Sequence, residues 1–279
     1  MSMARREITV AHSPDSDDAF MFYALATDQV RSERLAFRHH MAGIERLNRQ
    51  AMEGVWDVTA ISFAAFPYIA DRYALLPCGG SVGDAYGPVV VSRKALSPDQ
   101  LRGKKIAVPG TLTTAFLVLK IYEPDFEAVV TPFDQILEAV KEDRVDAGLL
   151  IHEGQLTFGD EGLHGVLDLG RWWREQFGLP LPLGGNAVRN EFPDSLRQEI
   201  TRMLRDSIQY ALDHRKEAMA YALSFARGMD TSLADRYVGM YVNHYTLDYG
   251  PQGRRAIEKL LQLGVEKGII ACPALAEIF

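Results

Sequence analysis

A histidine and a glutamate, His152 and Glu153, stand where a buried strand is expected to end. The stretch "DAGLLIHEGQLTF", residues 146–158, begins with small and apolar residues, as buried strands of parallel sheets do. Because histidine titrates near neutral pH and can accept a proton, His152 is a candidate general base. The alternative is a core histidine with only a structural role. Glu153 would point to the opposite face if the strand continued, so we expect it to be structural.

Hydroxyl groups follow two other predicted strands. In "VPGTLTTAF", residues 108–116, Thr113 and Thr114 lie at or near a helix start, where hydroxyls and unpaired backbone N–H groups can hold a carboxylate or phosphate. Ser62 follows the strand in "AISFAAF" in the same way. In both loops the alternative is ordinary N-capping of a helix.

The first predicted strand is followed by the acidic loop "HSPDSDD", residues 12–18. Ser16 or Asp17 can cap the next helix, and Asp18 suits its positive end. Three acids in this loop resemble a metal site, but no further ligand cluster accompanies them, so we expect no metal.

The composition limits the classes of partner. A formal net charge of −7 makes broad attraction to nucleic acid or anionic lipid unfavourable. The two cysteines, Cys78 and Cys272, are far apart, which fits a reducing compartment. The first residues lack the apolar run of a secretory signal, so we expect a cytoplasmic protein. Walker, dinucleotide, G-x-S-x-G and H-E-x-x-H motifs are absent from any fitting context, so we expect no cofactor.

The elements that must position these residues alternate between strand and helix patterns up to about residue 185, which predicts an α/β fold with mainly parallel sheets. Helical patterns follow to the end of the chain. Two strand and helix blocks joined by extended segments predict two lobes with a cleft between them, where ligands of such sheets bind. We expect a first lobe from residues 1–92, a second lobe from residues 93–185, and a return to the first lobe over residues 186–279.

Several segments resemble the 1,4-dihydroxy-6-naphthoate synthase family of the futalosine route to menaquinone. The combination of "GLLIHE" with "WWREQFGLPLPLG" is the most specific part of the likeness. The matching segments, in chain order, are "FMFYAL", "AISFAAF", "GPVVVSR", "IAVPGTLTTAFL", "GLLIHEGQLTF", "DLGRWWREQFGLPLPLG", "SIQYALDH" and "YVNHYTLDYG".

The resemblance implies a type II periplasmic-binding-protein fold used as a cofactor-independent lyase. Its substrate would be cyclic dehypoxanthinyl futalosine, a small-molecule carboxylate, and its product 1,4-dihydroxy-6-naphthoate with release of a three-carbon fragment. By this resemblance His152 is the proton acceptor. The residues expected to contact substrate are Ser13, Asp18, Ala60, Ile61, Ser62, Thr113 and Thr114.

The first loop departs from the family pattern. Many members read "SPCPNDTF" where residues 13–20 here read "SPDSDDAF", which keeps Ser13, Pro14, Asp18 and Phe20. Ala60 stands where a basic residue can occur, so one contact to a carboxylate is missing. Two other functions share the fold: chorismate dehydratase of the same route, and a solute-binding protein without catalysis.

Overall fold

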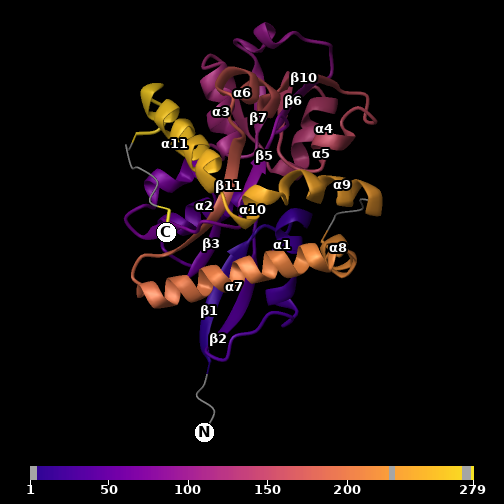
Figure 1. The fold of residues 1–279 in the computed structure, drawn as a ribbon. Coiled ribbons are helices and arrows are strands. Elements are labelled where there is room, and N and C mark those ends of the chain that lie inside the picture. The colour runs from indigo at the N-terminus through magenta and orange to yellow at the C-terminus, as the bar shows by residue number, and fades with distance from the viewer. Residues whose placement is uncertain (1–4, 226–229, 272–277) are drawn as a thin grey trace.

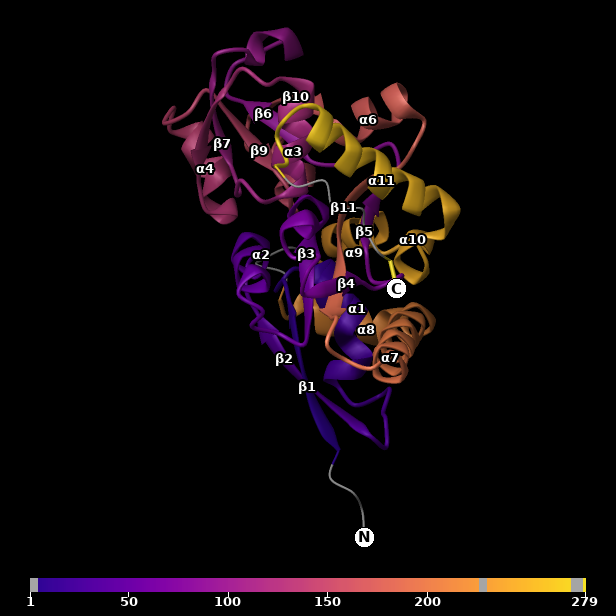
Figure 2. The ribbon, with the colours of Figure 1, turned by 90° about the vertical axis from the view of Figure 1, so that its left-hand side faces the viewer.

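Two β-sheets stand one beyond the other along the long axis of the molecule (Figures 1 and 2). The computed structural model describes residues 5–225, 230–271 and 278–279. Within these residues the first sheet has the strand order β2-β1-β3-β11-β4, with β5 also paired to β11, and the second has the order β10-β6-β9-β7-β8. We call the first sheet, with the helices that cover it, the first lobe. The second sheet with its helices is the second lobe.

Parallel pairing of β1 with β2 and β3 brings the carboxyl ends of these strands to one edge of the first sheet. In the second sheet β7 pairs in parallel with β8 and β9. The strands of the first sheet are β1 (Arg6–His12), β2 (Leu35–Met41), β3 (Val58–Ser62), β4 (Tyr73–Leu75), β5 (Ser81–Gly83) and β11 (Leu181–Arg189). Those of the second are β6 (Val89–Ser92), β7 (Lys105–Val108), β8 (Glu127–Val130), β9 (Ala147–Leu150) and β10 (His164–Asp168).

One helix, α1, lies in the interior of the first lobe. Helix α1 is buried on almost all sides because it packs against α7, α8 and α9. The α-helices are α1 (Ser16–Ala26), α2 (Ile44–Met52), α3 (Thr114–Tyr122), α4 (Ile136–Lys141), α5 (Gly154–Thr157), α6 (Leu169–Phe177), α7 (Asp194–Asp213), α8 (Arg215–Leu223), α9 (Thr231–Tyr241), α10 (His244–Leu247) and α11 (Gly250–Glu266). The 3₁₀ helices are η1 (Phe63–Tyr68), η2 (Pro98–Leu101) and η3 (Phe133–Gln135). No helix in this described part of the chain is long and apolar enough to cross a membrane.

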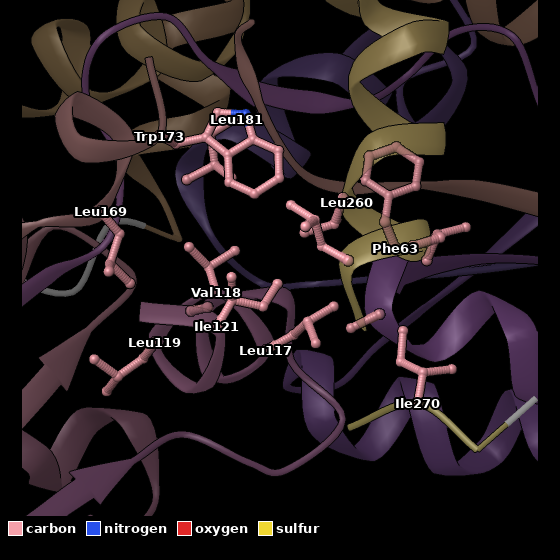
Figure 3. Close-up of a cluster of buried hydrophobic side chains, with 14 of the residues drawn as sticks. Phe63, Leu117, Val118, Leu119, Ile121, Leu169, Trp173, Leu181, Leu260 and Ile270 are labelled. Atoms are coloured by element: carbon pink, nitrogen blue, oxygen red, sulfur yellow. The ribbon is translucent and has the colours of Figure 1, made fainter. Parts of the chain in front are cut away.

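An apolar cluster joins the lobes (Figure 3). It combines Leu117 and Val118 of α3 and Trp173 of α6 with Phe63 of η1 and Leu260 of α11. Trp173 is fully buried, and its indole N–H donates to the carbonyl of residue 180 at 3.0 Å. The sequence predicted that the terminal helices return to the first lobe, and α11 packs against η1 and β11 there and also against α3 of the second lobe.

The alternating elements and the terminal helices have the predicted order, and the mixed α/β architecture with two sheets agrees with the fold class. The expectation of parallel sheets is only partly correct, because β6 pairs antiparallel with β9 and β10, and β11 pairs antiparallel with β3, β4 and β5. Strand β6, expected before the boundary at residue 92, pairs within the second sheet, and β11 has already joined the first sheet at Leu181, before residue 186. The extended segments that join the two blocks contain strands β6 and β11, because each pairs with strands that are distant in the sequence. The division into three segments stays a proposal.

Candidate active site

A cavity between the lobes brings together the predicted site residues. Its empty volume is about 700 Å³, including the part open to solvent. Lining side chains come from the ends of β1, β3 and β9, the start of α3, and from β11 and α9. The predicted residues that line it are Ser13, Asp18, Ala60, Ile61, Ser62, Thr113, Thr114 and His152.

The hydroxyl-bearing residues Ser62 and Thr114 both line the cavity. The oxygen of Ser62 accepts from Asn48 Nδ2 at 3.1 Å, and that of Thr114 accepts from the Ala64 backbone N–H at 3.1 Å. Among the described residues neither hydroxyl donates to a protein acceptor. Each hydroxyl therefore still has its hydrogen to donate, and an anionic ligand needs such donors.

Thr113 has a different role from its neighbour. Its hydroxyl accepts from the Phe116 backbone N–H at 3.2 Å and donates to the Gly110 carbonyl at 2.9 Å. This is the N-capping that the sequence left open as the alternative, and it uses the hydroxyl in both directions. The cap fixes the start of α3, so that the backbone N–H groups of Thr114 and Ala115, both cavity-lining residues, lie in the unpaired first turn.

His152 and an acidic group from the α1 region also line the cavity. The Nδ1 of His152 lies 3.2 Å from Asp15 Oδ2, and the same carboxylate oxygen accepts from the Ser13 hydroxyl. The ring of Phe133 lies edge-on to the imidazole, with centroids 4.2 Å apart. An Nδ1–H that donates to Asp15 leaves Nε2 as the basic nitrogen, so the carboxylate sets the tautomer that a general base requires.

Two further carboxylates of α1 are buried behind Asp15. Burial, reinforced by the charge of Asp15, raises the pKa of Asp17 to about 6. Burial and the charge of Asp17 raise the pKa of Asp18 well above its usual value. Asp18 accepts from the Ser13 backbone N–H at 2.7 Å, and Asp17 accepts from the Ser81 hydroxyl at 3.0 Å. Asp18 thus fixes the conformation of the loop through the Ser13 backbone. The capping side-chain bond expected of Ser16 or Asp17 does not form, because Asp15 occupies the N-cap position.

A pair of buried histidines supports the same loop. His12 Nδ1 lies 2.8 Å from the Ser13 carbonyl oxygen, and its Nε2 lies 3.2 Å from His39 Nδ1. Burial, and then the charge of His39, lowers the pKa of His12 to about 3. Since a carbonyl only accepts, the neutral His12 ring carries its hydrogen on Nδ1. His12 therefore holds the loop without adding charge near the carboxylates.

Glu153 does not lie on the face opposite His152, because β9 ends at Leu150 and both residues occupy the turn before α5. Within the described ranges, ligand atoms of Asp15, His152 and Glu153 all lie within 4.8 Å of one another. Carboxylate and imidazole groups at this spacing are the side chains here that would hold a divalent metal ion. The expectation that the protein needs no metal stays a prediction.

The sequence did not predict the aromatic wall of the cavity. Tyr237 and Tyr241 lie one turn apart on α9 and line the cavity. Tyr237 donates to the Ile151 carbonyl at 3.4 Å, and Tyr241 donates to Gln155 Oε1 at 2.7 Å. The four-residue spacing is ordinary for a core-facing helix stripe, so it gave no sign of a site 85 residues away in sequence. The other lining residues that we did not predict are Asp15, Asp17, Ile44, Gly79, Ser81, Pro88, Ala115, Ile151, Leu183, Gly184 and Gly185.

Known proteins resemble this chain along nearly its whole length. The menaquinone biosynthesis family model matches residues 8–266. The 1,4-dihydroxy-6-naphthoate synthase of Thermus thermophilus is 38% identical over 95% of this chain and 96% of its own length. The enzyme of the same name from Streptomyces coelicolor is 37% identical, over 98% of this chain and 97% of its own.

Solved structures support the fold. A crystal structure from Archaeoglobus fulgidus superposes with a TM-score of 0.91 at 48% identity, covering 95% of this chain and 98% of that one. The alkanesulfonate-binding protein SsuA of Xanthomonas axonopodis has a TM-score of 0.73 at 13% identity, with 98% of each chain covered, which shows a shared periplasmic-binding-protein fold. From the family match and the two full-length relatives it follows that the chain belongs to the menaquinone biosynthesis family.

Proposed function

We propose that the protein is a carbon–carbon lyase that converts cyclic dehypoxanthinyl futalosine to 1,4-dihydroxy-6-naphthoate. The observation that carries this proposal is one cavity lined both by His152, which lies 3.2 Å from Asp15, and by the hydroxyl-bearing residues Ser62 and Thr114. Two full-length relatives are named as this synthase, which favours it over chorismate dehydratase and over a solute-binding protein.

The proposed chemistry needs little beyond orientation and proton transfer. Formation of an aromatic product supplies driving force for cleavage of the carbon–carbon bond, and no electrons are exchanged with a partner. His152 Nε2 takes a proton from the bound substrate as the bond breaks. The Asp15 carboxylate stabilises the His152 imidazolium that results, because it lies 3.2 Å from Nδ1.

The charges around the cavity orient the substrate. No lysine or arginine is among the described lining residues, so a substrate carboxylate would bind to neutral donors. Ser62, Thr114 and the first N–H groups of α3 provide such donors, whereas each carboxylate of the α1 region repels an anion when it is ionised. We therefore place the substrate carboxylate beside the Ser62 and Thr114 hydroxyls, and its reacting carbon beside His152. With Ala60 in place of a basic residue, these donors carry the recognition.

We further propose that the enzyme is cytoplasmic and works without a metal or organic cofactor, as its own side chains supply the base and the donors. Treatment with a chelator should leave the rate within about twofold of the untreated rate, because one proton acceptor suffices for the step. A large loss of rate that added metal restores would assign the Asp15, His152 and Glu153 group a metal-dependent role.

The direct test is to incubate the purified protein with cyclic dehypoxanthinyl futalosine and, separately, with chorismate, and to follow products by mass spectrometry. We expect 1,4-dihydroxy-6-naphthoate from the first and no dehydration of the second. His152→Asn should lower the turnover rate about 100- to 10,000-fold, the usual contribution of a general base, while circular dichroism stays unchanged. Wild-type turnover by this variant would remove His152 from the mechanism, and dehydration of chorismate alone would replace the proposed function.

A further inference from the structure

Helix α2 of the first lobe binds both backbone polar groups of one residue of the second lobe, Leu112. The backbone N–H of Leu112 donates to Glu45 Oε2 at 3.2 Å, and the carbonyl of Leu112 accepts from Asn48 Nδ2 at 3.5 Å. Glu45 and Asn48 are three residues apart, so they lie on one face of α2. We call these two hydrogen bonds the Leu112 clasp.

The Leu112 clasp links Ser62 to the start of α3, the two segments whose hydroxyl-bearing residues line the cavity. The fully buried Asn48 side chain also donates to the Ser62 hydroxyl at 3.1 Å and accepts from the Ser62 backbone N–H at 2.8 Å. On the other side, Leu112 immediately precedes Thr113, the cap of α3. One amide side chain thus fixes Ser62 of the first lobe relative to the start of α3 in the second.

Arg49 and Gly110 also lie close to the Glu45 carboxylate. Its carboxylate also pairs with Arg49 at 2.8 Å, on the solvent side, where the Arg49 side chain is 61% exposed. A β-carbon at Gly110 would overlap the Glu45 carboxylate, so this position accepts only glycine while the clasp is formed. The loop and the helix therefore fit each other closely across the cleft.

We propose that Glu45 is a positioning residue that, with Asn48, holds the lobes closed at the distance at which Ser62 and Thr114 contact the same substrate. This inference rests on the proposed function for its kinetic readout. Without the clasp, part of the substrate binding energy must close the lobes, so the apparent affinity falls by the fraction of molecules that are closed. A saturated enzyme is closed in either case, and its turnover number is maintained.

The experiment compares wild type with Glu45→Ala, Glu45→Gln and the control Arg49→Ala. Glu45→Ala should speed hydrogen exchange of the Leu112 amide about tenfold and raise KM about tenfold, with kcat within about twofold, because one charge-assisted bond is lost. Glu45→Gln keeps an acceptor oxygen and should stay within about threefold of wild type in both readouts. Arg49→Ala leaves the carboxylate in place and should change neither by more than about twofold.

Gly110→Ala tests the clasp from the other lobe. Its methyl group displaces the Glu45 carboxylate, so it should reproduce the KM effect of Glu45→Ala. Unchanged Leu112 exchange and KM in Glu45→Ala, or a loss of kcat at constant KM, would overturn the proposal. If wild-type protein converts no substrate, the proposed function fails, and the exchange rates of the Leu112 amide in Glu45→Ala and Arg49→Ala then decide the clasp.

Discussion

At the scale of single residues, the predicted site is defined by which hydrogen-bonding atoms remain for a ligand. Sequence could name Thr113 and Thr114 together, because both stand at the start of a helix. It could not separate them, since only the fold shows that Thr113 binds Gly110 and Phe116 while Thr114 accepts from Ala64 across the cleft. The partner of His152 was beyond sequence reasoning for the same reason, as Asp15 lies 137 positions away in the chain and 3.2 Å away in space.

Asp17 gives a pH-dependent prediction. Its pKa is raised from 3.8 to about 6 by burial, so the folded protein holds this proton more tightly than the unfolded chain does. The free energy of unfolding must then fall as pH rises from about 4 through 6, and the ionised group costs up to about 3 kcal/mol at pH 7.5. Asp17→Asn should raise the free energy of unfolding by about 1 to 3 kcal/mol at pH 7.5 and by little at pH 4, measured by urea denaturation.

The exposed Asp71 provides the control for this comparison. Asp71→Asn should change the free energy of unfolding by less than about 0.5 kcal/mol at either pH, as surface substitutions usually do. An equal gain in the Asp17 variant at pH 4 and pH 7.5 would show that packing, and not ionisation, is responsible.

At the scale of elements, the pattern of residues predicted which segments form strands and helices around the cavity. Strand β7 ends directly before Pro109 and Gly110, and α3 begins a few residues later at Thr114. Strand β9 is buried at every position, as expected of a strand covered on both faces. The sequence placed the end of β9 too late, because Ile151 is apolar but already belongs to the turn. Strand β5 and the short helix α5 were not predicted, since three or four residues carry too little periodicity to recognise.

The capping of α3 separates structural from ligand-binding roles in neighbouring residues. Thr113→Ala removes the cap and should lower the free energy of unfolding by about 1 kcal/mol, with KM changed by less than about twofold. Thr113→Ser keeps a capping hydroxyl and should restore stability. Thermal or urea unfolding beside steady-state kinetics measures both effects.

Thr114→Val should instead raise KM about tenfold, because the hydroxyl that faces the cavity is lost and about 1.4 kcal/mol corresponds to a factor of ten. Thr114→Ser retains the hydroxyl and should keep KM within about threefold of wild type. A KM that rises in Thr113→Ala and not in Thr114→Val would reverse the two assignments.

At the scale of the whole molecule, alternation of strands and helices predicted two lobes with a cleft, and the resemblance named the fold. The division of strands between sheets was not predictable, because β6 and β11 pair with strands distant in sequence. Nor could periodicity show that α11 covers α3 as well as the first lobe (Figure 2). It also could not show that α9 supplies Tyr237 and Tyr241 to the cavity. Both depend on packing between lobes.

Placement of the substrate between the lobes is the central claim, and a crystal structure of His152→Asn with cyclic dehypoxanthinyl futalosine bound tests it most directly. The expected result is a substrate carboxylate within about 3 Å of the Ser62 and Thr114 hydroxyl oxygens, with the reacting carbon facing residue 152. A substrate bound outside this cavity, or with its carboxylate against Asp15 and its reacting carbon toward Ser62, would contradict the account.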